Sequence, residues 1–207
     1  DLLDNMCDRV LRAGIQVVFC MDHPEFYPTT VKAIEGTPVE TVVVCNVKSY
    51  LPWIKGFLGS LLGKIPKAGD YQPGHLFFDA VVSSSQPQPP QVEINALEDP
   101  ALIIYTGGTT GFPKGVPGNH LGMTSYVNDV TDDVAGSHLK EGEDVYIAVN
   151  PLFHIMALGL FMAIGLNRGN TVLLMPVPQV DAIMETIQRY HARWFLGVPA
   201  LYRMILE

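Results

Sequence analysis

The sequence is poor in basic residues and has no long apolar run. Its 207 residues include 13 Lys and Arg against 21 Asp and Glu, which gives a formal net charge of −8. This acidic balance argues against general nucleic-acid binding, because phosphate contacts need a basic surface. No segment reaches the ~18 uncharged apolar residues that span a bilayer. The longest candidate covers residues 155–166, and we interpret it as a buried helix.

Disulfide pairs, metal-ligand patterns and a visible signal peptide are also missing. The three cysteines, Cys7, Cys20 and Cys45, form no closed disulfide set and no CxxC pattern, so we interpret them as buried free thiols. The spacing of His, Cys, Asp and Glu is not typical of a zinc site. No charged segment followed by an apolar core opens the chain. These absences favour a cytoplasmic protein in a reducing compartment.

The residues that are present predict a folded core. Hydrophobic residues make up 48% of the chain and charged residues 16%, which excludes a disordered chain. Apolar runs predict strands at residues 15–20, 41–45, 101–105, 145–149, 171–175 and 194–196. Helical spacing predicts helices at residues 2–11, 26–34, 121–134, 157–166 and 180–191. The alternation predicts a layered α/β fold with a mostly parallel sheet, whose continuous apolar strands are buried on both faces.

Residues 47–95 interrupt this alternation, and we interpret them as a variable insertion. Apolar residues recur at helical spacing over 50–65, and a Ser/Gln/Pro-rich linker follows at 83–91. Four lysines accompany the helical stretch: Lys48, Lys55, Lys64 and Lys67. Two interpretations stay open. The helix docks on the sheet with its lysines in water, or residues 50–67 make peripheral contact with a membrane.

One segment, Tyr105-Thr-Gly-Gly-Thr-Thr-Gly-Phe-Pro-Lys-Gly-Val116, has the composition of a phosphate-binding loop. Its glycines let backbone amides approach an anion, its threonines add hydroxyl donors, and its lysine adds a positive charge. It follows the predicted strand at 101–105, and open α/β sheets bind ligands at the carboxyl ends of their parallel strands. The candidate phosphate ligands are Thr106, Gly107, Gly108, Thr109, Thr110, Gly111 and Lys114.

This loop fits neither of the two commonest nucleotide-binding patterns. Lys114 follows Pro113, and Gly115 stands where the Walker motif requires Ser or Thr. The glycines also lack the GxGxxG spacing of dinucleotide-binding folds.

The loop instead resembles the phosphate-binding signature of the adenylate-forming superfamily, approximately Tyr-Thr-Ser-Gly-Thr-Thr-Gly-x-Pro-Lys-Gly. Gly107 replaces the common Ser, as in bacterial and archaeal long-chain fatty-acyl-CoA ligases, and His120 resembles a His that often follows the motif. Two further segments resemble the family in the expected order. They are Asn150-Pro-Leu-Phe-His154, with Leu158 and Phe161 beyond it, and Gly197-Val-Pro-Ala-Leu201, in which Ala200 replaces Thr.

The resemblance implies a two-step ligase that uses ATP, Mg²⁺ and coenzyme A. A fatty acid or another carboxylate attacks the α-phosphate of ATP, and a thiol then displaces AMP to give a thioester. The loop residues named above would bind the ATP phosphates, Thr106 would also approach Mg²⁺, and Lys114 would stabilise the leaving pyrophosphate. His154 would shape the site near the acyl carboxylate. The resemblance thus implies Lys114 and His154 as catalytic residues.

Several parts of the family pattern are not found in these residues. They are the Gly-Tyr-Gly-x-Thr-Glu segment, the Thr-Gly-Asp segment and the small C-terminal domain with its lysine. We therefore expect that residues 1–207 are part of an N-terminal AMP-binding domain, inactive without the rest. An enzyme that adenylates an aryl or amino acid and a non-catalytic phosphate-binding module stay as alternatives. The sequence also leaves a homodimer open.

Overall fold

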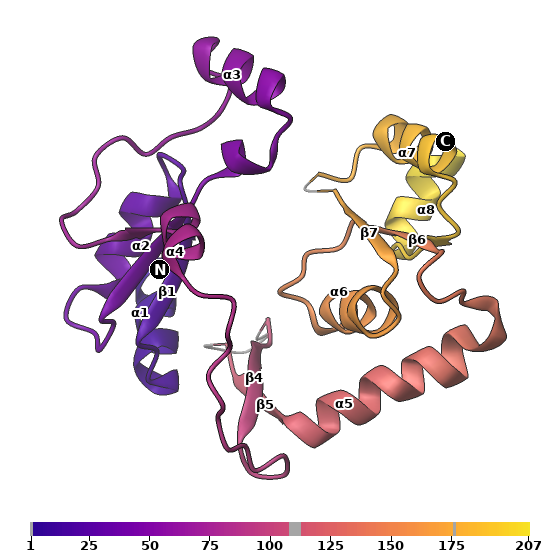
Figure 1. The fold of residues 1–207 in the computed structure, drawn as a ribbon, viewed down its shortest axis with the longest axis horizontal. Helices are drawn as coiled ribbons and strands as arrows, with labels where there is room; N and C mark the ends of the chain where they lie inside the picture. The colour runs from indigo at the N-terminus through magenta and orange to yellow at the C-terminus, as the bar shows by residue number, and fades with distance from the viewer. Residues whose placement is uncertain (1, 108–112, 176) are drawn as a thin grey trace. The chain divides into compact units, whose positions relative to one another are not determined.

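A computed structural model describes residues 2–107, 113–175 and 177–207 of the chain. Figure 1 shows its helices and strands. These residues form two compact units. The first extends to Gln91, and the second runs from Val92 to Glu207 apart from residues 110–113. The two units are described separately below.

The first unit contains a small parallel sheet with helices around it. The strands run in the order β1-β2-β3, all parallel, and Cys20 of β1 lies opposite Val44 of β2. Gly14 and Gly36 adopt positive φ just after the first two helices, a conformation that favours glycine. The elements are α1 (Leu2–Ala13), β1 (Val17–Met21), α2 (Phe26–Ile34), β2 (Thr41–Cys45), the 3-10 helix η1 (Val47–Tyr50), α3 (Trp53–Leu61), β3 (Leu76–Phe77) and α4 (Phe78–Ser84).

The expected burial of continuous strands on both faces holds for β2 and is wrong for β1. Val42, Val43 and Val44 are all buried, because α2 covers one face of β2 and α4 contacts the other. In β1, Cys20 is buried against α2, whereas Phe19 points to the opposite face and is 61% exposed. β1 is an edge strand of this sheet, and its face that holds Val17, Phe19 and Met21 lies open within the unit.

Residues 47–95, which we interpret as a variable insertion, contribute a strand to the sheet of the first unit. Leu76 and Phe77 form β3, which pairs in parallel with β2, so this part of the segment belongs to the sheet. The predicted helix over 50–65 is shorter and spans Trp53–Leu61 as α3. The predicted linker at 83–91 begins inside α4, which ends at Ser84. β3 has only two residues, and a run of that length gives no periodic signal in the sequence.

The second unit contains a hairpin, a second parallel sheet and the helices that cover this sheet. Its elements are β4 (Pro100–Tyr105), β5 (Gly115–Asn119), α5 (His120–Asp129), the π-helix η2 (Val130–Ala135), the 3-10 helix η3 (Gly136–His138), β6 (Val145–Ala148), α6 (Ile155–Leu160), the π-helix η4 (Phe161–Asn167), β7 (Thr171–Leu174), α7 (Val180–Tyr190), β8 (Trp194–Phe195) and α8 (Pro199–Leu206).

The sheet of the second unit has its strands in the order β7-β6-β8, all parallel. Successive side chains of the central strand β6 point to opposite faces. Tyr146 and Ala148 pack against α6 and η4, while Ile147 and Val149 pack against α7 and α8. Figure 1 shows these helices on the two sides of the sheet. The predicted α/β fold with parallel strands and covering helices is therefore confirmed.

The glycine-rich loop does not follow a parallel strand, which corrects the sequence-based expectation. β4 pairs antiparallel with β5, and Tyr105 lies opposite Gly115. The loop therefore joins the two strands of a hairpin. β5 was not predicted because Gly115-Val-Pro-Gly-Asn119 holds two glycines and a proline, which are rare in strand interiors.

The structure bears on the apolar segments and on the cysteines. Within the described ranges no helix is long and apolar enough to cross a membrane. The three cysteines are free, but the expectation that they are buried is correct only for Cys20, since Cys7 and Cys45 are half-buried.

Candidate functional site

The base of the glycine-rich loop is held closed by its own backbone. The Thr106 N–H donates to the Lys114 carbonyl oxygen at 2.9 Å, directly beyond the last paired residues of β4 and β5. The Thr106 hydroxyl donates to the same oxygen at 3.4 Å. The side chains of Thr106 and Lys114 are both exposed. The hairpin thus holds Thr106 and Lys114 next to each other where the loop begins and ends.

Of the predicted phosphate ligands, the structure describes Thr106, Gly107 and Lys114. The other predicted ligands, Gly108, Thr109, Thr110 and Gly111, lie outside the described residues. Gly107 is exposed, and a Cβ atom added to it would meet no atom of the described residues within 4 Å. The Ser that is common at this position in the resembled family therefore has room here.

The other two motifs meet at the carboxyl edge of the β7-β6-β8 sheet. Asn150-Pro-Leu-Phe-His154 directly follows β6, and Gly197-Val-Pro-Ala-Leu201 follows β8. The Asn150 side chain joins them, because its Nδ2 donates to the Leu196 carbonyl oxygen at 3.0 Å. This link was not predicted. The position of Asn150 at the head of the motif was the only signal for it.

His154 is the N-cap of α6. Its Nδ1 accepts a hydrogen bond from the Met156 N–H at 3.2 Å, and the side chain is exposed. In the neutral ring the proton then resides on Nε2. His154 therefore offers an N–H donor to a ligand while its other nitrogen caps the helix.

Two cavities of the second unit lie near these motifs. A cavity of about 360 Å³ at the carboxyl ends of β6 and β7 is lined by residues of β6, the Asn150–Phe153 stretch, Leu174 and Met175. A larger cavity of about 580 Å³ lies between β4, α5, α6 and η4. Its lining includes His120, Leu158 and Met162, and Leu158 stands one helical turn beyond His154. Both volumes lie in the range of small-molecule sites.

Comparison with known families identifies the family of this chain. The profile described as "AMP-binding enzyme" matches residues 4–207. The chain belongs to the AMP-binding enzyme family. It is 36% identical over 129 residues to 4-coumarate-CoA ligase 2 of Narcissus pseudonarcissus, a match that covers 62% of this chain and 23% of that protein.

Solved structures of two AMP-binding enzymes share the fold. A benzoate CoA ligase from Burkholderia xenovorans LB400 matches 99% of this chain and 34% of its own length, with a TM-score of 0.71 and 18% identity. A long-chain-fatty-acid-CoA ligase from Archaeoglobus fulgidus matches 99% and 45%, with a TM-score of 0.57 and 22% identity. The chain therefore spans less than half of the length of each of these proteins.

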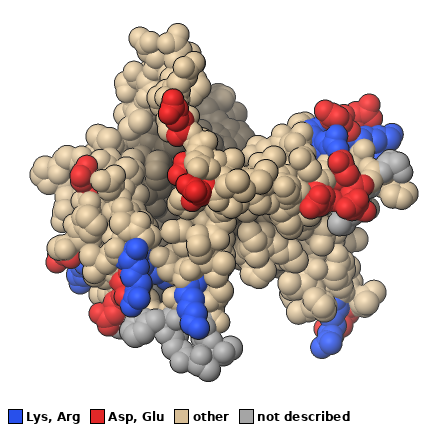
Figure 2. Space-filling view, turned by 90° about the horizontal axis from the view of Figure 1, so that it is seen from below, with Lys and Arg blue, Asp and Glu red and all other residues tan. Residues whose placement is uncertain are grey.

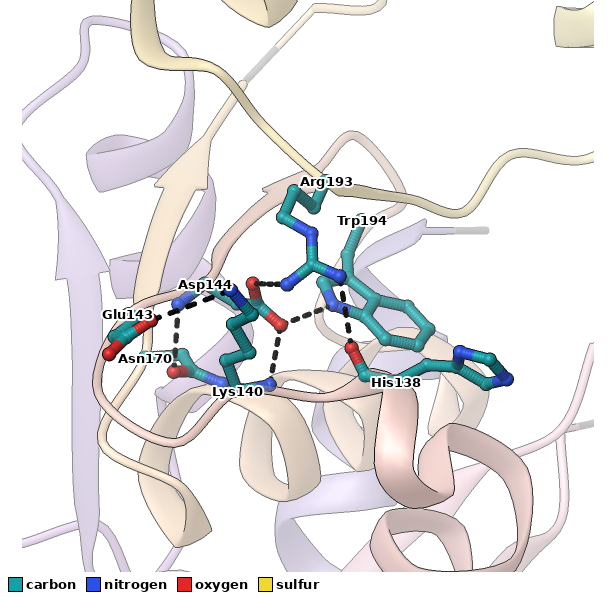
Figure 3. Close-up of polar contacts among 7 residues, drawn as sticks. All are labelled: His138, Lys140, Glu143, Asp144, Asn170, Arg193 and Trp194. Carbon is teal, nitrogen blue, oxygen red and sulfur yellow. Dashed lines mark hydrogen bonds and ion pairs between the residues drawn. The ribbon is translucent and has the colours of Figure 1, made fainter.

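A buried carboxylate holds the opposite edge of the same sheet, as Figure 3 shows. Asp144 is 1% exposed, and its carboxylate accepts from the Lys140 N–H at 2.8 Å, Trp194 Nε1 at 2.8 Å and Arg193 Nη1 at 2.6 Å. Burial acts to raise the pKa of Asp144, but these hydrogen bonds and the Arg193 charge outweigh it and lower the pKa. Asp144 thus ties the amino ends of β6 and β8 together.

Charged side chains on the surface of this AMP-binding enzyme chain are scattered. Figure 2 shows a face on which charged side chains stand in small groups with wide uncharged areas between them. Over residues 2–107, 113–175 and 177–207, no three His, Cys, Asp or Glu side chains gather as a metal site would require.

Proposed function

We propose that the protein is an acid-thiol ligase that activates a carboxylic acid with ATP and passes the acyl group to coenzyme A. The observation that carries the proposal is the hairpin β4–β5, which brings Thr106 and Lys114 together at the base of a glycine-rich loop. The family assignment supports the same chemistry, since its relatives include CoA ligases.

In this proposal, Lys114 and the loop residues hold the β- and γ-phosphates of ATP. The charge of Lys114 stabilises the pyrophosphate as it leaves, because negative charge gathers there during in-line displacement. Magnesium would neutralise part of the same charge. Thr106 suits it as a single hydroxyl ligand, because its hydrogen bond to the Lys114 carbonyl is long at 3.4 Å and Mg²⁺ takes most of its ligands from phosphate and water.

We propose that the carboxylate of the acid lies at the carboxyl edge of the β7-β6-β8 sheet. Open α/β sheets bind ligands at this edge. His154 Nε2–H would orient the acid, and because Nδ1 is occupied by the Met156 N–H, His154 acts in polar shaping and not in proton transfer. Asn150 acts as a positioning residue that holds the motif against the chain beyond β8.

Two classes of acid substrate fit the two cavities, and each class predicts a different effect of changing the larger cavity. An arylpropenoic or benzoic acid is compact enough for the cavity of about 360 Å³ beside Asn150, and the matched 4-coumarate-CoA ligase favours this class. A fatty acid would extend along α6 into the cavity of about 580 Å³ past Leu158. The resemblance of Gly107 to long-chain ligases favours the fatty acid.

The variant Met162→Trp should separate the two classes. Its larger side chain fills the cavity between α5 and η4, away from Asn150 and His154. If the acid is fatty, the variant should lower kcat/KM for a C16 acid by about 10-fold to 100-fold. This corresponds to the loss of one or two well-packed contacts between the acyl chain and the cavity. If the acid is aromatic, activity with 4-coumarate stays within about twofold. The measurement is acid-dependent AMP release by the full-length protein, with thermal unfolding as the check on folding.

A further inference from the structure

A segment of the first unit combines positive charge with exposed apolar side chains. Residues 46–69, here named the basic segment, hold four of the 13 Lys and Arg residues and none of the 21 Asp and Glu residues. All four lysines are exposed: Lys48, Lys55, Lys64 and Lys67. In a chain of net charge −8, this concentration of one sign is a local feature that composition alone does not show.

Helix α3 of the basic segment turns its apolar side outward. Trp53 is 80% exposed, Phe57 61% and Leu61 72%, and these residues stand at intervals of four along the helix. Ile54, Leu58 and Leu62 widen this exposed face. At 100° per residue, the positions from Trp53 to Leu58 cover an arc of about 140°, which Lys55 borders.

The inner side of α3 is made of small residues. Gly56 is buried, and a Cβ atom added to it would lie 3.4 Å from the Lys48 carbonyl oxygen. A Cβ atom on Gly59 would lie 3.0 Å from the Ile65 side chain. The helix therefore packs through glycines against its own segment and leaves its large apolar side chains outside. A helix docked on a sheet would have the reverse arrangement, so the first interpretation of this stretch does not hold within this unit.

The base of the basic segment is fixed by the buried carboxylate of Asp22. It accepts from Asn46 Nδ2 at 2.7 Å, from the Ala68 N–H at 2.7 Å and from the Tyr71 hydroxyl at 2.8 Å. Burial and the hydrogen bond to Asp22 raise the pKa of Tyr71 to about 12, so its hydroxyl stays a donor. Both ends of the segment are thereby held at the end of β1, and Figure 1 shows α3 standing away from the sheet of its unit.

We propose that α3 binds the headgroup region of an anionic lipid membrane. Trp53, Phe57 and Leu61 would enter the interface, where indole rings are favoured, and the four lysines would contact lipid phosphates and carboxylates. Charge complementarity favours this partner over a second copy of the chain, because a symmetric dimer through α3 would bring two sets of four lysines together. The inference stands apart from the proposed ligase activity.

Co-sedimentation of the full-length protein with vesicles tests the proposal. The protein should pellet with phosphatidylcholine vesicles that contain phosphatidylserine in about 0.05 M NaCl and should be released in about 0.5 M NaCl. It should pellet weakly with phosphatidylcholine alone. No binding to the anionic vesicles at low salt, or equal binding to both vesicles, would contradict the proposal.

Matched variants assign the binding to α3. The double variant Trp53→Ser with Phe57→Ser should lower the partition coefficient at least about 10-fold, and Lys55→Gln with Lys64→Gln about 25-fold. The controls, Val92→Ser with Leu97→Ser and Lys32→Gln, change equally exposed residues elsewhere and should leave binding unchanged. Equal losses in the controls would overturn the assignment. So would a dimer in light scattering that the Trp53 and Phe57 double variant dissociates, because a second copy would then occupy this face.

Discussion

His154 caps α6 with one ring nitrogen and, in our proposal, meets the acid with the other. The variant His154→Asn separates these roles, because Asn is among the best N-cap residues but lacks the imidazole Nε2–H. We expect an unchanged melting temperature and a KM for the acid raised about 5-fold to 50-fold, the loss of one hydrogen bond. His154→Ala should also lose about 0.5 to 2 kcal/mol of unfolding free energy. A normal KM in His154→Asn would contradict the proposed contact.

Gly107 is expected to tolerate the Ser that is common in the family, since no atom of the described residues lies within 4 Å of an added Cβ. The variant Gly107→Ser should keep its melting temperature within about 2 °C and its KM for ATP within about threefold. Gly115→Ala is the matched contrast, because its Cβ would lie 3.0 Å from Ile103 Cγ2. We expect it to cost about 1 to 3 kcal/mol in thermal or denaturant unfolding. Similar losses in both variants would show that the loop is packed at Gly107 as well.

The elements of the second unit are joined at both edges of its parallel sheet. Asp144 ties β6 to β8 at the amino end, and Asn150 ties the chain beyond β6 to the chain beyond β8 at the carboxyl end. Only the second edge carries family motifs. The first edge therefore holds the strands in place, and the second is free to bind a ligand.

Replacing Asp144 should destabilise this sheet. Asp144→Asn removes a buried carboxylate and leaves the Lys140 and Trp194 N–H groups poorly paired, so we expect a loss of about 2 to 4 kcal/mol in denaturant unfolding. Glu143→Gln is the control, because Glu143 is an exposed carboxylate beside it. Its effect should stay within about 0.5 kcal/mol.

The pH dependence of unfolding follows from the lowered pKa of Asp144. The pKa of Asp in an unfolded chain is about 3.9. The stabilisation from Asp144 is therefore fully present above that value and is lost as the pH falls through the lower pKa of the folded state. The difference in stability between the protein and Asp144→Asn should shrink as the pH falls below about 4. A difference that stays constant between pH 7 and pH 2.5 would contradict the role of the charge.

Elements with strong local signals were predictable from the sequence. The predicted helix at 26–34 and strand at 41–45 match α2 and β2. Apolar spacing defines both locally, and Gly36 marks the end of the helix. The strands β3 and β5 were not predicted. β3 has two residues, and β5 contains Pro117 and two glycines. Both strands form by pairing with a neighbouring strand, and no local sequence pattern indicates that pairing.

At the scale of the whole molecule, the sequence predicted which motifs carry the site but not how they are held. The motif at 105–116 indicated a phosphate loop, yet its place in an antiparallel hairpin depends on the pairing of Tyr105 with Gly115. The contact of Asn150 with the Leu196 carbonyl and the cavity beside it depend on the order of the strands. Family motifs record residue types, whereas these links join residues that are not neighbours in the sequence.

Acid-dependent exchange of labelled pyrophosphate into ATP by the full-length protein tests the central claim most directly, because it reports adenylate formation without the thiol step. The account predicts exchange with 4-coumarate or a fatty acid as the acid. It also predicts a loss of about 100-fold or more in Lys114→Ala, since that charge stabilises the leaving pyrophosphate. Lys140→Ala, which removes another exposed lysine, should be unaffected. Exchange that survives in Lys114→Ala, or no exchange with any acid while ATP still binds, would contradict the account.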